Sequence, residues 1–133
     1  KAVERNPRSA GCINALAWMY TEDLGKPEAA LALLEKFVAG GGRETVEMLD
    51  THAATLHRLG KLDRAKAKLT ECLAAAGQTP TLTAATYRLG RIHWDAGNKS
   101  EAVTYLRDAL GLHKRLGGLT DAEVATAQSL IGG

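Results

Sequence analysis

Residues 87–110 have the sequence YRLGRIHWDAGNKSEAVTYLRDAL, and the spacing of small and apolar residues in this stretch decides the fold. Gly97 is followed five residues later by Ala102, and Leu106 and Ala109 come four and seven residues after that alanine. Side chains at i, i+4 and i+7 lie on one face of an α-helix. The stretch therefore predicts a helix with a single apolar stripe.

The same pattern occurs twice more, closer to the N-terminus. A glycine is again followed five residues later by an alanine at Gly25/Ala30 and at Gly60/Ala65, and successive alanines are 35 and 37 residues apart. The apolar stripe continues after these alanines through Leu34, Phe37, Leu69 and Cys72. Self-similarity at a period of this size is typical of helical repeat proteins.

Each unit also has a large residue followed by a small one in the helix before its glycine. These pairs are Leu16-Ala17, His52-Ala53 and Leu89-Gly90. With this pair and a period near ~34 residues, the chain resembles the tetratricopeptide-repeat (TPR) family. The resemblance covers about residues 1–110 and implies that the two helices of each hairpin approach closely at their small residues. His52 departs from the family, which prefers leucine there.

The spacing differs in the first repeat. Ala53 and Gly90 lie seven residues before their glycines, whereas Ala17 lies eight residues before Gly25. We therefore expect one extra residue in the turn of the first repeat.

The resemblance implies an all-α fold, a right-handed solenoid of three α-hairpins followed by a C-terminal capping helix. Residues 1–7 resemble the end of a second helix, so we expect them to be the tail of a preceding repeat in a longer, bacterial-type TPR array. The expected repeats and cap span residues 8–42, 43–79, 80–117 and 118–133.

Helix boundaries follow from apolar periodicity and from glycine and proline positions. Asn98 with Glu101 has the form of a capping box, and Thr120 or Asp121 is expected to cap the final helix. Expected helices span about residues 9–23, 27–39, 44–59, 63–75, 81–96, 99–116 and 121–130.

The last of these helices carries Val124, Ala127 and Leu130 on one side. We expect this side to pack on the second helix of the third repeat, because a solenoid needs its terminal face covered. The start of a fourth repeat is the alternative interpretation.

Composition excludes several classes of protein. A net charge of +2 gives no indication of nucleic-acid or anionic-membrane binding. The longest apolar run of the first repeat has six residues, from Ala29 to Leu34, whereas a spanning helix needs ~20. Cys12 and Cys72 form neither a disulfide framework nor a metal-ligand spacing, so the sequence leaves the compartment open.

No catalytic, cofactor or metal site is expected. The glycines at 40–42 and at 97 lack the strand and the lysine of a phosphate-binding loop. His52 and His57 are five residues apart, which turns them about 140° from each other on a helix. His52 and His93 fall on apolar sides and are interpreted as packed, hydrogen-bonded core residues. We do not expect an enzyme.

The TPR resemblance implies a different place for function. The first helices of the hairpins line a concave groove in this family, and the groove would hold a peptide or protein segment. The groove candidates in this chain are Asn14, Trp18, Asp50, His57, Tyr87, Arg88, Arg91 and Trp94. An ordinary solvated helix face is the alternative for this set.

Arg88 and Arg91 are three residues apart beside two aromatic side chains. Guanidinium groups bind carboxylates in pairs of hydrogen bonds, so the groove would suit an acidic or C-terminal segment. Only Arg88 matches the two-carboxylate clamp with which some TPR proteins hold chaperone tails. Trp18 stands at an asparagine site of that clamp, and Asn14 and Ala84 stand at lysine sites.

Three alternatives to a peptide-binding scaffold remain open. The repeats could self-associate, giving a homo-oligomer, or regulate a larger enzyme. They also resemble, loosely, bacterial TPR proteins attached to envelope and exopolysaccharide-export systems.

Overall fold

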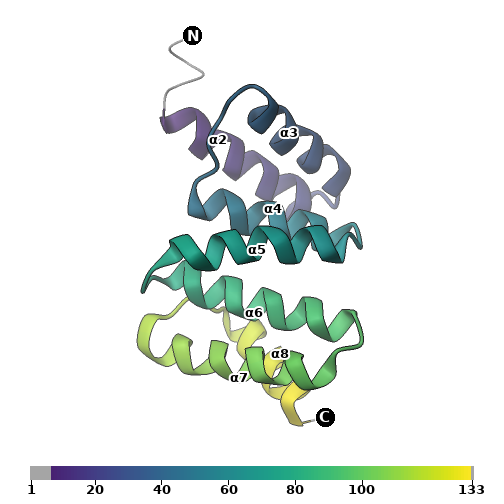
Figure 1. Ribbon diagram of the computed structural model, residues 1–133, viewed down its shortest axis with the longest axis vertical. Coiled ribbons are helices and arrows are strands. Elements are labelled where there is room, and N and C mark those ends of the chain that lie inside the picture. The colour runs from purple at the N-terminus through teal and green to yellow at the C-terminus, as the bar shows by residue number, and fades with distance from the viewer. Residues whose placement is uncertain (1–6, 133) are drawn as a thin grey trace. The chain divides into compact units, whose positions relative to one another are not determined.

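The computed structural model describes residues 7–132, and the all-α prediction is confirmed for them, with the seven expected helices and no strand. Residues 1–6, expected to belong to a preceding repeat, lie outside the described part. The helices are α2 (Pro7–Trp18), α3 (Pro27–Ala39), α4 (Val46–Arg58), α5 (Leu62–Ala76), α6 (Pro80–Asp95), α7 (Lys99–Leu116) and α8 (Asp121–Gly132), with a π-helical segment η1 (Met19–Asp23) continuing α2 (Figure 1).

The chain forms two compact units, which meet between Lys68 and Leu69 inside α5. In the first unit α2 packs on both α3 and α4, and α3 also packs on α4. The core of this packing consists of Ala17, Ala30, Leu34 and Met48, all fully buried. Helix α2 thus contacts both α3, its partner in the hairpin, and α4, the first helix of the next hairpin.

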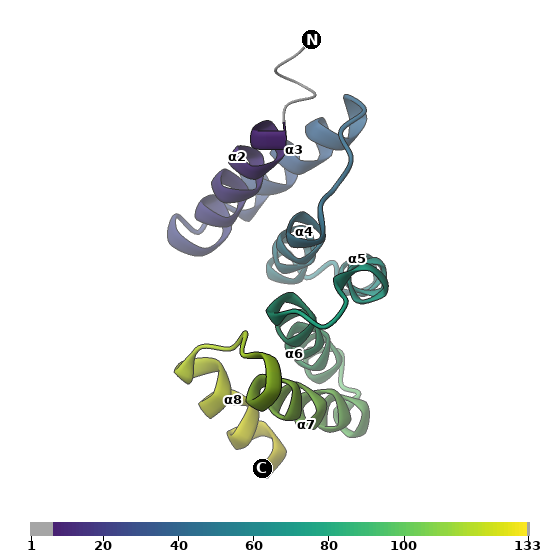
Figure 2. The ribbon, with the colours of Figure 1, turned by 90° about the vertical axis from the view of Figure 1, so that its left-hand side faces the viewer.

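The second unit is built on the hairpin of α6 and α7, with α8 packed on α7 (Figure 2). Its core cluster consists of Tyr87, Leu106, Ala109 and Ala127, with Leu130 packed against it. The predicted packing of α8 on α7 is confirmed for Ala127 and Leu130. Val124 is half-buried.

Small residues mark the closest helix contacts, as the repeat pattern predicts. Ala65 and Ala102 are 0% exposed. A β-carbon added to Gly90 would lie 2.9 Å from the Leu106 side chain and 3.3 Å from the Ala102 carbonyl oxygen. A larger residue at position 90 would require the Leu106 side chain to move.

The glycine of each repeat unit is required by its backbone. Gly25, Gly60 and Gly97 have φ of +61°, +75° and +89°, a region that side chains with a β-carbon rarely adopt. At Gly60 the turn is a Schellman motif, in which the Lys61 N–H donates to the Leu56 carbonyl at 2.9 Å. These turns end the first helix of each hairpin and reverse the chain.

The extra residue of the first repeat lies in the helix, and its predicted placement in the turn is wrong. The Leu24 N–H donates to the Met19 carbonyl at 3.0 Å, which closes the wider ring of a π-helix. A π-helical segment takes up additional residues without ending a helix. As a consequence the Lys26 N–H reaches back six residues, to Tyr20, whereas the equivalent Lys61 reaches back five.

The predicted capping box at α7 is also wrong. Asn98 makes no side-chain cap there, and its amide nitrogen instead lies 3.4 Å from His93 Nδ1. The reciprocal pair occurs at α8, where the Thr120 N–H donates to Glu123 Oε1 at 2.9 Å and the Glu123 N–H donates to Thr120 Oγ1 at 3.1 Å. Thr120 is therefore the cap of the final helix.

Candidate peptide-binding surface

Tyr87, the first candidate on α6, is a core residue. Its side chain belongs to the hydrophobic cluster with Leu106 and Ala127, and the residue is only 5% exposed. This differs from the sequence-based expectation, which placed the ring on a ligand-facing surface. The reason is α8, which supplies Ala127 to the same cluster. Tyr87 can therefore act on a ligand only through its hydroxyl.

That hydroxyl positions Arg91, one helical turn further on. Arg91 Nη1 donates to Tyr87 Oη at 3.0 Å, and the guanidinium carbon lies 5.9 Å from the ring centre. Arg91 is half-buried, and its Nε finds no hydrogen-bond partner in the part of the chain that the structure describes. One donor of a fixed guanidinium is thus left unused.

Arg88 and Trp94 complete the candidates on α6, and both are half-buried. The Lys99 ammonium lies 4.9 Å from the centre of the Trp94 ring, a cation–π contact. Trp94 therefore has the Lys99 ammonium of α7 close to its ring, and its own helix also carries Arg88 and Arg91.

The neighbouring His93 is half-buried and stacks on Tyr105 of α7, with ring centres 5.2 Å apart and an angle of 9° between planes. The interpretation of His93 as a packed residue is confirmed, but the residue does not belong to the buried core. Its ring joins the two helices of the hairpin.

In the first unit, Asn14 and Trp18 are one turn apart on α2. Trp18 is 40% exposed, and Asn14 is half-buried. Asn14 Oδ1 is buried and has no hydrogen-bond partner among residues 7–132. Asp50 and His57, two turns apart on α4, are half-buried, and each has an interaction partner. The structure therefore divides the eight candidates equally between the two units.

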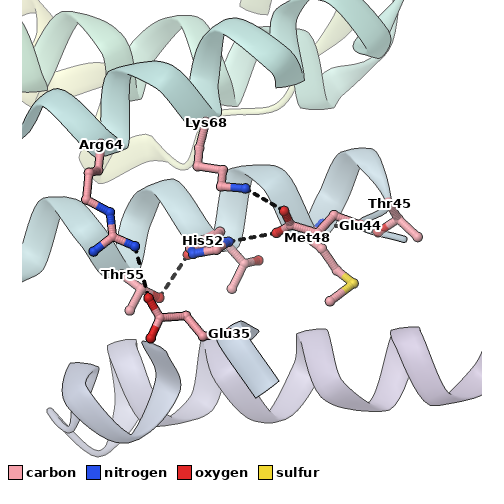
Figure 3. A network of polar contacts seen from close by, with 9 residues as sticks. Glu35, Glu44, Thr45, Met48, His52, Thr55, Arg64 and Lys68 are labelled. Atoms are coloured by element: carbon pink, nitrogen blue, oxygen red, sulfur yellow. Dashed lines mark hydrogen bonds and ion pairs between the residues drawn. The ribbon is translucent and has the colours of Figure 1, made fainter. Parts of the chain in front are cut away.

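The sequence analysis missed a polar network that joins α4, the residue Glu44 before it, and α5 (Figure 3). Glu44 precedes α4 and accepts from His52 Nδ1 at 2.7 Å and from Lys68 Nζ at 2.6 Å. The side chains of His52 and Glu44 are only 4% and 9% exposed. The interpretation of His52 as a buried, hydrogen-bonded residue is confirmed. Glu44 explains why a histidine can replace the leucine that the family prefers.

Charge compensation keeps this buried carboxylate ionised. Burial raises the pKa of Glu44, but the hydrogen bonds and charges of His52 and Lys68 outweigh it, and the pKa lies below its ordinary value of 4.5. Because a carboxylate only accepts hydrogen bonds, His52 carries its proton on Nδ1. By contrast, the ion pair of Glu35 with Arg64 is half exposed on both sides. It contributes little to stability.

A second buried polar contact joins α4 to the π-helical segment. Thr55 Oγ1 donates to the Thr51 carbonyl at 2.9 Å, so the 2.9 Å contact between Thr21 and Thr55 uses the Thr21 proton. Thr21 is fully buried. Neither threonine belongs to the repeat pattern, so that pattern does not predict this contact.

Within residues 7–132 no group of three or more His, Cys, Asp and Glu side chains could hold a metal ion. No helix of this range is long and apolar enough to cross a membrane. An open depression over α7 is lined by residues that include Tyr105, Arg107, Asp108 and Arg115. Its lining carries both basic and acidic side chains, unlike the arginine pair of α6.

A protein-family model described as tetratricopeptide repeat matches residues 9–40 and 82–120, together more than half of the chain. The chain belongs to the tetratricopeptide-repeat family. It is also similar to a solved structure, "Crystal structure of PilW, widely conserved type IV pilus biogenesis factor", at 22% identity and a TM-score of 0.71.

The match to PilW covers 98% of this chain but 59% of the PilW chain, and at this identity it shows the fold alone. A search of curated proteins found no match. TPR domains are protein-interaction modules, so the family assignment implies protein binding in general.

Proposed function

We propose that this TPR module binds a peptide or protein segment on the first helices of its hairpins, α2 and α4 in the first unit and α6 in the second. The observation that carries the proposal is the unused hydrogen-bonding capacity of Asn14 Oδ1 and Arg91 Nε. Buried polar groups nearly always have partners in native proteins. Both atoms belong to residues that the TPR resemblance places on the ligand-facing side.

The two atoms differ in hydrogen-bonding role, so each requires a different partner group on the ligand. Asn14 Oδ1 is an acceptor and suits a backbone N–H of a bound segment. Arg91 Nε is a donor and suits a carbonyl or carboxylate oxygen. An unmade buried hydrogen bond costs about 1–3 kcal/mol, so each would gain from a ligand that supplies the missing partner.

Carboxylate chemistry is favoured on α6. Arg88 and Arg91 are three residues apart, and Lys99 adds a further cation beside Trp94. Arginine pairs bind carboxylates in a fixed geometry, and tryptophan supplies apolar contact area at binding hot spots. We therefore expect a segment that carries an acidic side chain or a C-terminal carboxylate.

We also propose that residues 43–79 form a repeat equivalent to those on either side. The family model leaves this segment unmatched, but α4 and α5 form the same helix–glycine–helix unit. The proposed boundaries remain residues 8–42, 43–79 and 80–117, followed by a cap at 118–133. The likeness to PilW adds support for the fold and assigns no partner.

The test begins with an immobilised library of random peptides, synthesised once with free and once with amidated C-termini. Selected peptides are then titrated by calorimetry into the wild type, Arg91→Ala and Arg107→Ala. We expect Arg91→Ala to weaken binding at least tenfold and Arg107→Ala, on α7, to leave it unchanged. Affinity should also fall as salt rises, because exposed charge contacts are screened. Loss of binding in Arg107→Ala alone would place the site on α7 and contradict the proposal.

A further inference from the structure

Helix α8 is attached to its repeat by a small part of its surface. Among residues 121–132 only Ala127 is fully buried, whereas α6 contains seven buried residues. Val124 and Leu130 are half-buried. Elements with few buried apolar contacts open at a lower free energy than the core. Release of α8 therefore requires less free energy than unfolding of the hairpin of α6 and α7.

The fully buried residue of α8 lies in the cluster that contains Tyr87 of α6. This cluster consists of Tyr87, Leu106, Ala109 and Ala127, and Leu130 packs against it. With α8 in place, Tyr87 is only 5% exposed. Side chains of packed interiors are held in defined rotamers, so docking of α8 fixes the direction of the Tyr87 ring.

The hydroxyl of the same ring holds Arg91. Arg91 Nη1 donates to Tyr87 Oη at 3.0 Å, while Arg91 Nε is buried and has no hydrogen-bond partner among residues 7–132. A ligand that binds a mobile arginine must also offset the rotamer entropy that the side chain loses. A fixed Tyr87 hydroxyl therefore raises the affinity of Arg91 for a carboxylate by preorganisation.

The connection from α7 to α8 is fixed by two contacts that do not involve Tyr87. A β-carbon added to Gly118 would collide with the Pro80 carbonyl oxygen, so the connection lies directly against the start of α6. The Leu119 N–H donates to His113 Nδ1 at 3.3 Å. These contacts keep an opened α8 beside its docking site, so that opening is reversible.

We propose that docking of α8 and binding of a carboxylate at Arg91 are coupled through Tyr87. Docked α8 fixes the Tyr87 ring, the Tyr87 hydroxyl holds Arg91 ready for the carboxylate, and release of α8 frees both side chains. Such coupling is reciprocal, so a bound carboxylate also stabilises the docked helix. The inference rests on the proposed function for the choice of Arg91 as the binding residue, and it adds a regulatory role for a helix outside the groove.

The first test uses the protein without a peptide. Hydrogen exchange of the Arg91 Nε–H is measured by NMR in the wild type, Tyr87→Phe and Ala127→Asp. Both variants should exchange this proton severalfold faster, because phenylalanine keeps the ring without the hydroxyl and a buried aspartate displaces α8. Ser129→Asp adds the same charge at an exposed position of α8 and should leave the exchange unchanged. Tyr105→Phe on α7 is the matched control for loss of a hydroxyl.

The second test titrates a free-carboxylate peptide selected from the library into the same proteins by calorimetry. Tyr87→Phe and Ala127→Asp should each weaken binding about tenfold, the equivalent of one hydrogen bond to a charged group. The double variant should bind no more weakly than either single variant, because α8 acts through the Tyr87 hydroxyl. Bound peptide should also slow exchange of the α8 backbone amides in the wild type and not in Tyr87→Phe.

An Arg91 Nε–H that exchanges at the wild-type rate in Ala127→Asp would overturn the coupling, and so would additive losses of affinity in the double variant. Leu130→Ser replaces Ala127→Asp if the latter unfolds the chain. Equal peptide affinity in the wild type and Tyr87→Phe, with loss of binding in Arg91→Ala, would overturn the coupling and leave the proposed function intact. If no peptide binds, the proposed function is contradicted, and the exchange measurement still decides whether α8 controls Arg91.

Discussion

Gly90 on α6 faces Leu106 on α7 so closely that a β-carbon at position 90 would lie 2.9 Å from the Leu106 side chain. This contact belongs to the repeat pattern itself, because Gly90 is the small residue of its unit and Leu106 stands on the apolar stripe. The hairpin of α6 and α7 therefore depends on a missing side chain.

Replacing Gly90 by leucine should overpack this contact and lower the free energy of unfolding by ~1–3 kcal/mol. Gly111→Ala is the matched control inside α7, since a β-carbon there meets nothing within 4 Å. It should raise stability by ~0.5–1 kcal/mol through helix propensity. Urea unfolding followed by circular dichroism measures both. A Gly90→Leu protein as stable as the wild type would show that the hairpin contact is misplaced.

Ala102 lies on α7 at the same contact, so replacing it also tests the assigned repeat register. It is 0% exposed, and its carbonyl oxygen lies 3.3 Å from the β-carbon position of Gly90. Ala102→Leu should cost ~1–3 kcal/mol, measured as a lower melting temperature. Thr104→Leu, at an exposed position of the same helix, should change little. An unchanged melting temperature in Ala102→Leu contradicts the assigned repeat register.

Glu44 should make stability depend on pH in a defined direction. Its folded-state pKa is lowered, so its contribution is complete above the ordinary value of 4.5 and is lost as pH falls through the folded pKa. Glu44→Gln should therefore cost ~1–3 kcal/mol at pH 7, because His52 and Lys68 lose their charged acceptor. The difference from the wild type should shrink below pH 4.5.

Glu35→Gln is the control for that experiment. It removes the half-exposed partner of Arg64 and should change stability by less than ~1 kcal/mol at any pH. Denaturant titrations of the three proteins between pH 3 and 8 provide the comparison. A pH-independent difference between the wild type and Glu44→Gln would contradict the ionised network.

Removal of residues 118–133 should uncover the core cluster around Tyr87, Leu106 and Ala109, which Ala127 and Leu130 cover in the intact chain. We expect the shortened protein to unfold at lower denaturant concentration and to associate, because its apolar surface increases. Light scattering and dye binding report both effects. A shortened protein that is monomeric and equally stable would favour α8 as the start of another repeat.

Sequence periodicity predicted the elements that depend on local spacing. Gly25, Gly60 and Gly97 occupy positive-φ turns, Ala65 and Ala102 are fully buried as expected, and Ala102 lies at the contact with Gly90. These features depend on residues within one repeat. They can therefore be read from one sequence.

The features that sequence reasoning missed depend on partners far apart in the chain. Tyr87 is buried because α8, some forty residues later, packs over it. Glu44 and Lys68 lie outside the repeat pattern, so nothing in the motif paired them with His52. Asn98 and Thr120 each have a glutamate three residues on, but only Thr120 makes the reciprocal hydrogen bonds with its glutamate.

The central claim is that α6 holds a carboxylate-bearing segment through Arg88, Arg91 and Trp94. Amide and guanidinium chemical shifts, measured while a selected free-carboxylate peptide is added to the labelled chain, test it most directly. The account predicts that Arg91 Nε–H shifts most, together with the backbone amides near Arg88 and Trp94. Shifts confined to α7, around Arg107 and Arg115, would contradict it.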